Sequence, residues 1–285
     1  MRVAVQGETV GEPGRRRCHG TAPNPVGPDR FASGIRRLYT LLPAVPLQPG
    51  PTGNQPMGGR PMLTETTTIT GPRGPMPAFV ARLDERPRPA VIVLEGIYGF
   101  DQELHRITTL VANAGYVGCA IDYLRGQEVA RGFHSATIEA DLAMTRDWLN
   151  ERRYADHGKV ATWGFGVGGA VAFMGAMLPG ITAAIAFYGQ SITKGLPDGG
   201  DAPIKNAGEL RAPLLLVFGG IDTEIAEDDI RRIETRLAAA GKTAEIQVYP
   251  NVGHSFFRED RDTIASREIA DAWDRVGSFL RRSFK

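Results

Sequence analysis

Disulfides, membrane-spanning segments and a strong net charge are all missing from this sequence. Its 285 residues include only two cysteines, Cys18 and Cys119, in segments of very different character, so a structural disulfide is not expected. No apolar run reaches the length that spans a bilayer, which predicts no membrane association and leaves the cytoplasm as the default compartment. The formal net charge of +1 argues against nucleic acid as a partner.

Metal and phosphate chemistry also lack their usual sequence patterns. His105, His134 and His157 have no ligand spacing with one another, and no Cys–His pair suggests zinc, so no metal is expected. The glycine-rich segment 164–169 is not followed by the Lys-Ser/Thr of a P-loop, and no acidic partner of a dinucleotide-binding motif is evident. We therefore expect no cofactor.

The first 61 residues differ in composition from the rest of the chain. They contain eight Arg against three acidic residues, and ten of the 20 prolines. Such a segment cannot bury enough apolar surface to offset chain entropy, which predicts a disordered extension, with Met57 or Met62 as the true start. Alternatively, residues 31–42 could form a short basic amphipathic helix for targeting or a membrane surface. The folded domain is predicted to cover residues 62–285.

From residue 64 onward the hydrophobic pattern becomes regular. The pattern predicts strands over 64–70, 76–83, 90–94, 117–121, 159–163, 181–187, 213–218 and 244–249, a helix whose apolar face spans 104–111, and helices near 135–152, 168–178, 225–240 and 263–282. An initial hairpin followed by strand–helix alternation is typical of a mostly parallel, doubly wound α/β sheet flanked by helices in a single domain. Ligands of such sheets bind beyond the carboxyl ends of the strands.

Residues 164–169, Gly-Phe-Gly-Val-Gly-Gly, have the pattern of a nucleophile elbow without its nucleophile. They join an apolar strand to a helix of small residues. In α/β-hydrolases the middle residue of this turn is a nucleophile such as Ser, held on a strained corner. Here it is Gly166, so covalent catalysis by an elbow Cys or Ser is excluded. Main-chain donors at the turn survive this change if the turn keeps its shape, and Gly accepts unusual φ/ψ at little cost.

Two further polar residues follow predicted strands in a definite order. Asp222 comes after strand 213–218, and His254 after strand 244–249. Nucleophile position, acid and then His is the chain order of α/β-hydrolase triads, in which the carboxylate orients a His that moves protons. Either residue alone would more often be a cap or a turn residue. Together, at the ends of these strands, they favour the catalytic interpretation.

Over residues 64–283 the chain resembles the dienelactone hydrolases. The resemblance is carried by Glu95-Gly96-Ile97-Tyr98-Gly99-Phe100, Gly115-Tyr116, Asp122, Gly164–Gly169, Tyr188-Gly189, Asp222 and His254-Ser255-Phe256-Phe257-Arg258. It implies an α/β-hydrolase fold and hydrolysis of a carboxylic ester or lactone, with a small-molecule ester, lactone or carboxylate as ligand. The oligomeric state is left open.

The same resemblance implies roles for individual residues. Gly166 takes the place of the family's catalytic Cys, and Asp222 and His254 correspond to the other two triad members. Arg258, with Tyr98, is implied in holding a substrate carboxylate. The family's oxyanion-hole amides correspond to those of Val167 and Ile97. A second substrate-holding Arg is also expected in the family, and Arg125 and Arg131 are the nearby candidates.

Glu95 departs from the family pattern by one residue. Family members read Glu-Ile-Phe/Tyr-Gly, where the Glu modulates the protonation of the cysteine. Aligning Ile97-Tyr98-Gly99 puts Gly96 in the Glu position and Glu95 one residue early. A one-residue shift in a strand points a side chain to the opposite face. Glu95 reaches the pocket only if the chain has left the strand there, and otherwise is a solvated or capping carboxylate.

Three classes of function stay open. The protein could bind a carbonyl or carboxylate compound without catalysis, because the atom needed for acyl transfer is missing. It could instead be a hydrolase or lyase in which His254 activates water or moves protons, or in which a loop hydroxyl supplies the nucleophile. The candidate hydroxyls are Ser191, Thr193 and Ser135. Finally, the loop 189–212 could be a lid or a surface that docks a partner protein.

Overall fold

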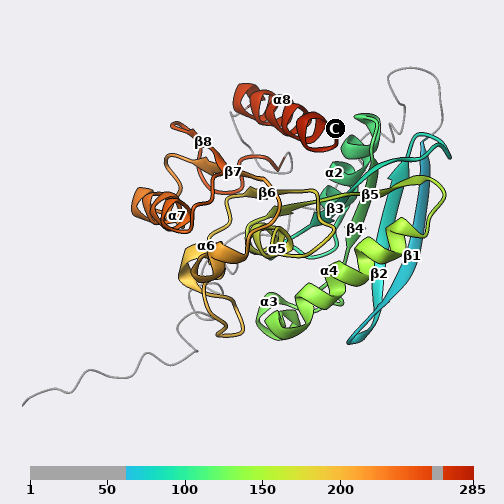
Figure 1. Cartoon of the computed structure of the whole chain (residues 1–285), viewed down its shortest axis with the longest axis horizontal. Helices are drawn as coiled ribbons and strands as arrows, with labels where there is room; N and C mark the ends of the chain where they lie inside the picture. The colour runs from blue at the N-terminus through green and yellow to red at the C-terminus, as the bar shows by residue number, and fades with distance from the viewer. Residues whose placement is uncertain (1–61, 259–265) are drawn as a thin grey trace, which may run out of the picture. The chain divides into compact units, whose positions relative to one another are not determined.

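The chain folds around one eight-stranded sheet. The computed structural model describes residues 62–258 and 266–285, so the extension predicted for residues 1–61 lies outside the described part. The strands are β1 (Leu63–Gly71), β2 (Gly74–Arg82), β3 (Arg88–Leu94), β4 (Val117–Ile121), β5 (Ala155–Phe165), β6 (Ala183–Phe187), β7 (Leu214–Gly219) and β8 (Glu245–Tyr249). Their order in the sheet is β1-β2-β4-β3-β5-β6-β7-β8 (Figure 1).

The predicted hairpin and the parallel strands are both present. β1 and β2 pair antiparallel at one edge, β2 pairs antiparallel with β4, and the pairs from β4 to β8 are parallel. The Thr-rich β1 alternates between exposed and more buried residues, whereas β4, β6 and β7 are buried throughout. Continuous burial is expected of parallel strands covered on both faces. The predicted α/β-hydrolase fold is confirmed.

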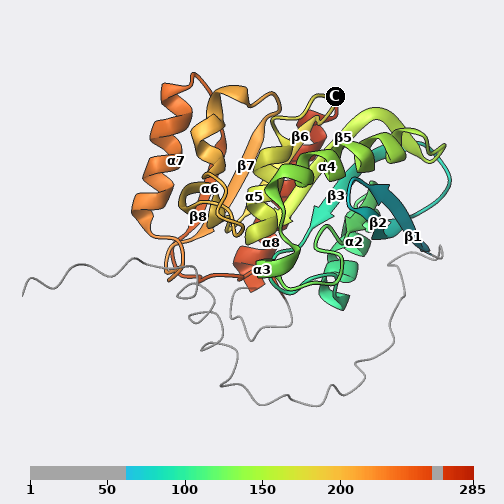
Figure 2. The same cartoon turned by 90° about the horizontal axis from the view of Figure 1, so that it is seen from below.

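Each strand from β3 onward is followed by at least one helix, and α8 follows the last strand, β8. The helices are α2 (Gln102–Asn113), α3 (Val129–Gly132), α4 (Ser135–Asn150), α5 (Val167–Gly175), α6 (Ser191–Lys194), α7 (Glu227–Ala239) and α8 (Ser266–Ser283), with a 3-10 segment η1 (Pro203–Glu209). α8 lies on one face of the sheet, and α4 and α5 lie on the other (Figures 1 and 2). The short elements α6 and η1 fall in the segment 189–212, which the sequence predicted as a loop. Elements of so few residues show no hydrophobic periodicity, so the sequence pattern could not reveal them.

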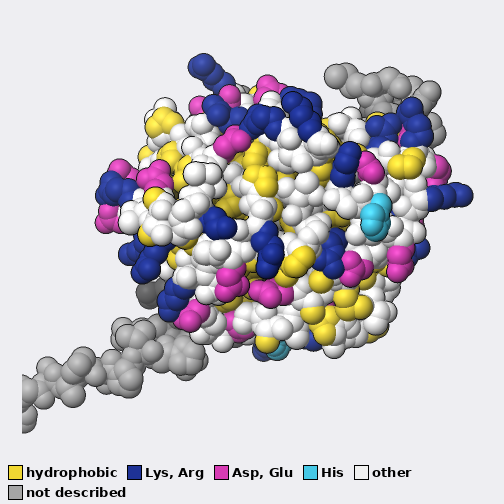
Figure 3. All heavy atoms as spheres, viewed as in Figure 1, with side chains coloured by type: hydrophobic (Ala, Val, Ile, Leu, Met, Phe, Trp, Pro, Cys, Tyr) yellow, Lys and Arg dark blue, Asp and Glu magenta, His cyan; other side chains and the backbone are white. Residues whose placement is uncertain are grey.

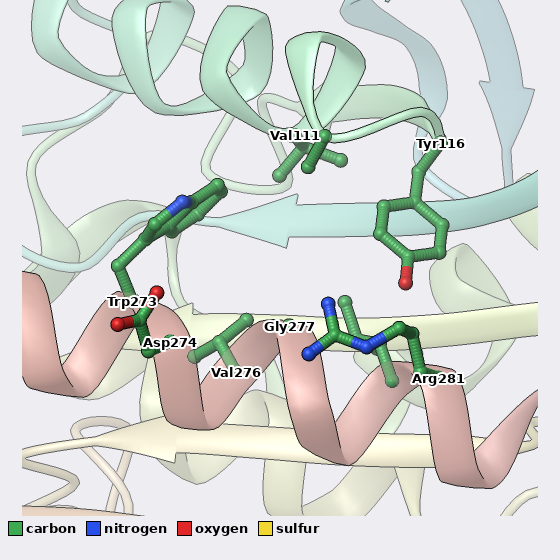
Figure 4. A pocket seen from close by; sticks show the side chains of 9 residues that line it. Val111, Tyr116, Trp273, Asp274, Val276, Gly277 and Arg281 are labelled. Atoms are coloured by element: carbon green, nitrogen blue, oxygen red, sulfur yellow. The ribbon is translucent and has the colours of Figure 1, made fainter.

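On the face in Figure 3, basic and acidic side chains are interspersed, in keeping with 33 Lys and Arg against 32 Asp and Glu in the chain. Within the described ranges, none of the helices has the length and apolar character needed to cross a membrane. A cavity of about 80 Å³ lies between α2 and α8, lined by Val111, Tyr116 and Trp273 among others (Figure 4).

Candidate active site

The elbow keeps its strained shape without a side chain. β5 ends at Phe165 and α5 begins at Val167, with Gly166 between them at φ 56° and ψ −121°. A residue with a Cβ is rarely found at such a φ, at a cost of about 1–3 kcal/mol, whereas Gly adopts it readily. A Cβ built on Gly166 would meet no atom within 4 Å. Open space therefore lies where a nucleophile's side chain would project.

Close backbone packing fixes the start of α5 against the sheet. A Cβ on Gly164 would lie 1.9 Å from the Gly168 carbonyl oxygen, and one on Gly168 would lie 2.4 Å from the Leu94 carbonyl oxygen. Real side chains cannot approach backbone so closely, so only Gly fits at these two positions. The first turn of α5 is thereby held against the end of β3.

The loop after β3 passes directly over the elbow. A Cβ on Gly96 would lie 2.9 Å from the Phe165 carbonyl oxygen and 3.0 Å from the Val167 nitrogen. Val167 is the first residue of α5, so its amide has no partner within the helix. Neither this amide nor that of Ile97 donates a hydrogen bond to another residue of the described chain. Both predicted oxyanion donors are thus available beside the elbow, one of them at a helix N-terminus that favours negative charge.

Asp222 and His254 form a hydrogen-bonded pair beside the elbow. The Asp222 carboxylate is fully buried, and its Oδ2 lies 2.8 Å from His254 Nδ1. Its Oδ1 accepts hydrogen bonds from the amides of Glu224 (2.7 Å) and Ile225 (3.1 Å). A carboxylate that accepts these bonds places the proton of a neutral imidazole on Nδ1. Nε2 is then left as the acceptor that could take a proton from a substrate or a water molecule.

A small cavity brings these groups together. Its volume of about 20 Å³ has room for a water molecule. The lining residues are Glu95, Ile97, Tyr98, Gly166, Val167, Tyr188, Gln190, Glu224, His254, Ser255 and Arg258. Of the eight positions that the sequence singled out for the active site, seven therefore line this cavity, and the eighth, Asp222, contacts it through His254.

Arg258 is buried and already paired with carboxylates of the chain. It is 2% exposed, with Nη1 at 3.0 Å from Glu95 Oε2 and Nη2 at 2.7 Å from Asp101 Oδ2. The guanidinium also lies over the Tyr98 ring, 4.3 Å from its centroid. A substrate carboxylate would have to compete with two carboxylates for this cation. The role of Arg258 in substrate binding therefore stays a prediction.

Glu95 points into the cavity, although it stands one residue early in the motif. β3 ends at Leu94, so the alternation of strand side chains no longer applies at position 95. A side chain at Gly96 would collide with the elbow, which leaves Glu95 as the residue that can supply the carboxylate. Glu95 is 5% exposed, so the interpretation as a solvated carboxylate is wrong. Burial raises its pKa to about 7, against the opposing effect of Arg258.

The other candidates from the sequence lie elsewhere. Arg125 pairs with Asp141 at 2.7 Å, Arg131 is exposed on α3, and neither lines the cavity. Ser135 donates to the Asp198 carboxylate (2.7 Å) and Thr193 to that of Asp229 (3.1 Å). Ser191 is buried in α6. None of the three hydroxyls lines the cavity with His254, so no substitute nucleophile is found among them.

Four cavity residues were not assigned a role from the sequence. They are Tyr188, Gln190, Glu224 and Ser255. Tyr188 and Ser255 have positive φ angles of 41° and 61°, which non-Gly residues adopt mainly where surrounding structure imposes them. Tyr188 stands directly after β6, and its ring centroid lies 5.2 Å from that of His254. Its place after a predicted strand was the signal that could have identified it.

No metal centre accompanies this site within residues 62–258 and 266–285. In these ranges no three His, Cys, Asp or Glu side chains are grouped so as to hold a metal ion. Cys119 is buried in β4, where burial raises the pKa of its thiol to about 12. A thiol with this pKa is protonated and unreactive at neutral pH.

Comparison with known proteins identifies the family and agrees with the fold. The family model described as "Dienelactone hydrolase family" matches residues 76–284. A Yersinia pestis protein assigned as a carboxymethylenebutenolidase is 32% identical over 230 residues, which cover 74% of this chain and 85% of that protein. A crystal structure from Klebsiella pneumoniae, assigned as a dienelactone hydrolase, superposes with a TM-score of 0.70 at 27% identity, covering 77% of this chain and 98% of the other. An esterase from Pyrobaculum calidifontis superposes with a TM-score of 0.64 at 19% identity, covering 77% and 85%, which is a likeness of fold.

Proposed function

Since the chain belongs to the dienelactone hydrolase family, we propose that it hydrolyses a carboxylic ester or lactone with water in place of the elbow nucleophile. The observation that carries this proposal is the Asp222–His254 pair, held at 2.8 Å, whose free nitrogen faces the cavity left open at Gly166. The substrate class is inferred from the family, and the use of water is inferred from the absence of a side chain at Gly166.

The proposed reaction requires only water and the ester. The oxygen of a water molecule attacks the carbonyl carbon while His254 Nε2 accepts one of its protons. The negative charge that develops on the carbonyl oxygen is stabilised by the amides of Val167 and Ile97. The carbon–oxygen bond to the leaving group then breaks, and the departing alkoxide takes the proton back from His254. The products are a carboxylic acid and an alcohol, and no acyl-enzyme forms.

The expected rates are modest because the covalent step is missing. Binding and oxyanion stabilisation without the triad nucleophile accelerate acyl transfer by roughly 10³–10⁴ over water in serine proteases. A positioned general base contributes about 10²–10⁴. A water-activating protein of this kind would therefore be slower than its family members, and its turnover would depend on His254.

The test is hydrolysis of a small aryl ester and of a dienelactone by the wild type, His254→Ala and Gly166→Cys. Wild-type turnover that is lost in His254→Ala supports the proposal. If the wild type is inactive and Gly166→Cys gains activity, the scaffold is intact and the proposal is wrong. A role in binding a carbonyl or carboxylate compound would then be the better interpretation. Equal turnover by wild type and His254→Ala would also contradict the proposal.

A further inference from the structure

A second carboxylate faces the catalytic nitrogen of His254. Glu224 Oε2 lies 3.8 Å from His254 Nε2, on the opposite side of the imidazole from Asp222. Glu224 is half exposed and lines the cavity together with Gly166. No hydrogen bond of its carboxylate to another residue of the described chain is found, so this group is available to a molecule in the cavity.

The position of Glu224 is fixed by the same residue that orients His254. The Glu224 amide donates to Asp222 Oδ1 at 2.7 Å, while Asp222 Oδ2 binds His254 Nδ1. The Glu224 carbonyl oxygen accepts a hydrogen bond from Lys194 Nζ. The backbone of Glu224 is therefore anchored on both sides of its Cα. One buried carboxylate thus orients the imidazole and also holds the backbone from which the second carboxylate projects.

Two acceptors that face each other need a donor between them. With the imidazole proton on Nδ1, both His254 Nε2 and Glu224 Oε2 are acceptors, and 3.8 Å is too long for a direct hydrogen bond. A water molecule has two O–H groups and can donate one to each, as bridging waters do across such distances. The cavity beside them has room for a water molecule.

We propose that Glu224 is a catalytic residue that holds the attacking water against His254. This inference rests on the proposed hydrolysis. It assigns to Glu224 the positioning of the attacking oxygen, which the side chain of an elbow nucleophile would otherwise provide. One proton of the water passes to His254 Nε2 as the oxygen attacks the carbonyl carbon. The other stays on the oxygen, hydrogen-bonded to Glu224, so that a lone pair is directed toward the substrate. Glu224 itself neither gains nor loses a proton.

The first test compares Glu224→Gln with Glu227→Gln in the full-length protein. Glu227 is a matched control because it lies three residues further on, is exposed, and pairs with Arg231 rather than lining the cavity. With an aryl ester as substrate, Glu224→Gln is expected to lower kcat by about 10- to 100-fold, with KM nearly unchanged, because misplacing a reactant costs rate rather than binding. Glu227→Gln is expected to match the wild type. Equal kcat values for Glu224→Gln and the wild type would overturn the proposal.

The second test uses Gly166→Ser, in which the serine would be acylated before water is needed. In this background Glu224→Gln should leave the acylation burst unchanged and slow deacylation by about 10- to 100-fold, because only deacylation uses the held water. A merely structural disturbance of His254 would slow both steps equally. Equal slowing of acylation and deacylation, or an unchanged rate of deacylation, overturns the role of Glu224.

The two tests separate this inference from the proposed function. If the wild type is inactive but Gly166→Ser hydrolyses the ester, water-only hydrolysis is wrong, and the deacylation rates alone decide the role of Glu224. If wild-type turnover depends on His254 and not on Glu224, the proposed function stands and this inference fails. Absence of hydrolysis by both the wild type and Gly166→Ser overturns both.

Discussion

In one half of this candidate active site the polar groups belong to the backbone, whereas in the other half they belong to side chains. On the elbow half, Gly166 has no side chain, and the useful groups are the amides of Val167 and Ile97. On the other half, side chains supply everything: Asp222 Oδ2 holds His254 Nδ1 at 2.8 Å. The elbow retains its unusual φ of 56° even though no nucleophile is present. The backbone geometry of the turn is therefore present without a side chain at its middle residue.

This contrast predicts that oxyanion stabilisation depends on backbone packing, while proton transfer depends on particular side chains. The elbow half is maintained by glycines that allow close approach of β3, β5 and α5. The Asp222–His254 half is maintained by hydrogen bonds to a buried carboxylate. Substitutions in the two halves should therefore differ in how they affect activity and stability, and four substitutions test this difference.

Asp222→Asn should have the largest effect, on the side-chain half. The amide of Asn would donate to Nδ1, which moves the imidazole proton to Nε2 and prevents His254 from accepting a proton. We expect kcat for an aryl ester to fall by roughly 10⁴, the scale known for this substitution in the serine-protease triad. Steady-state kinetics measures the effect, with circular dichroism as the control for folding. A loss of less than tenfold would show that Asp222 does not set the tautomer.

Gly96→Ala should impair the backbone half. The new methyl group would lie within 3.0 Å of the Val167 nitrogen, so the loop must move and the two amides lose their common direction. Loss of an oxyanion donor costs roughly 10²–10³ in kcat. Gly208→Ala is the matched control, since a Cβ there meets nothing within 4 Å and its φ is ordinary. Unchanged kcat in Gly96→Ala would contradict the assignment of these amides.

Glu95→Gln should change how stability depends on pH. The pKa of Glu95 is raised to about 7 in the folded protein from an ordinary 4.5, so the native state keeps a proton that the unfolded chain releases. The protonated Glu95 therefore contributes about 3 kcal/mol to the free energy of unfolding. This contribution is fully present below about pH 4.5 and is lost as the pH rises through about 7. Urea unfolding from pH 4.5 to 8 should therefore show a decline for the wild type relative to Glu95→Gln. If the free energy of unfolding depends on pH in the same way for both proteins, the raised pKa of Glu95 is contradicted.

Gly166→Ala should have the smallest effect, a loss of stability together with a small loss of activity. The methyl group meets open space, but φ 56° is unfavourable for a residue with a Cβ, at a cost of about 1–3 kcal/mol. Because the methyl group takes up part of the cavity in which the attacking water is proposed to lie, kcat for ester hydrolysis should also fall, by about tenfold. Thermal unfolding and kcat are measured together. A large loss of activity without loss of stability would mean that Gly166 itself is needed by the substrate.

The fold and the Asp222–His254 pair could be predicted because both follow from local patterns. Strand–helix alternation predicted the parallel sheet, and parallel strands bring their carboxyl ends to one edge. Asp222 and His254 follow the neighbouring strands β7 and β8, so their proximity followed from the topology. The predicted boundaries differ from the observed ones by a few residues, with β5 extended to Ala155–Phe165.

What could not be predicted depends on contacts between distant segments. The inward position of Glu95 results from the packing of Gly96 on the elbow, which no strand periodicity reveals. Arg258 is paired with Glu95 and with Asp101, which precede it by 163 and 157 residues. Glu224 acquires its place from the hydrogen bonds around Asp222. In each case a three-dimensional contact, rather than a sequence pattern, decides what the residue can do.

The most direct test of the central claim is intact-protein mass spectrometry during turnover of an aryl ester, quenched within the first turnovers, for the wild type and Gly166→Ser. The account predicts that the wild type turns over in a His254-dependent manner with no acylated protein at any time, because water attacks the ester. Gly166→Ser should accumulate an acyl adduct on residue 166. An acyl adduct on the wild-type protein would contradict the account, since another side chain would then be the nucleophile.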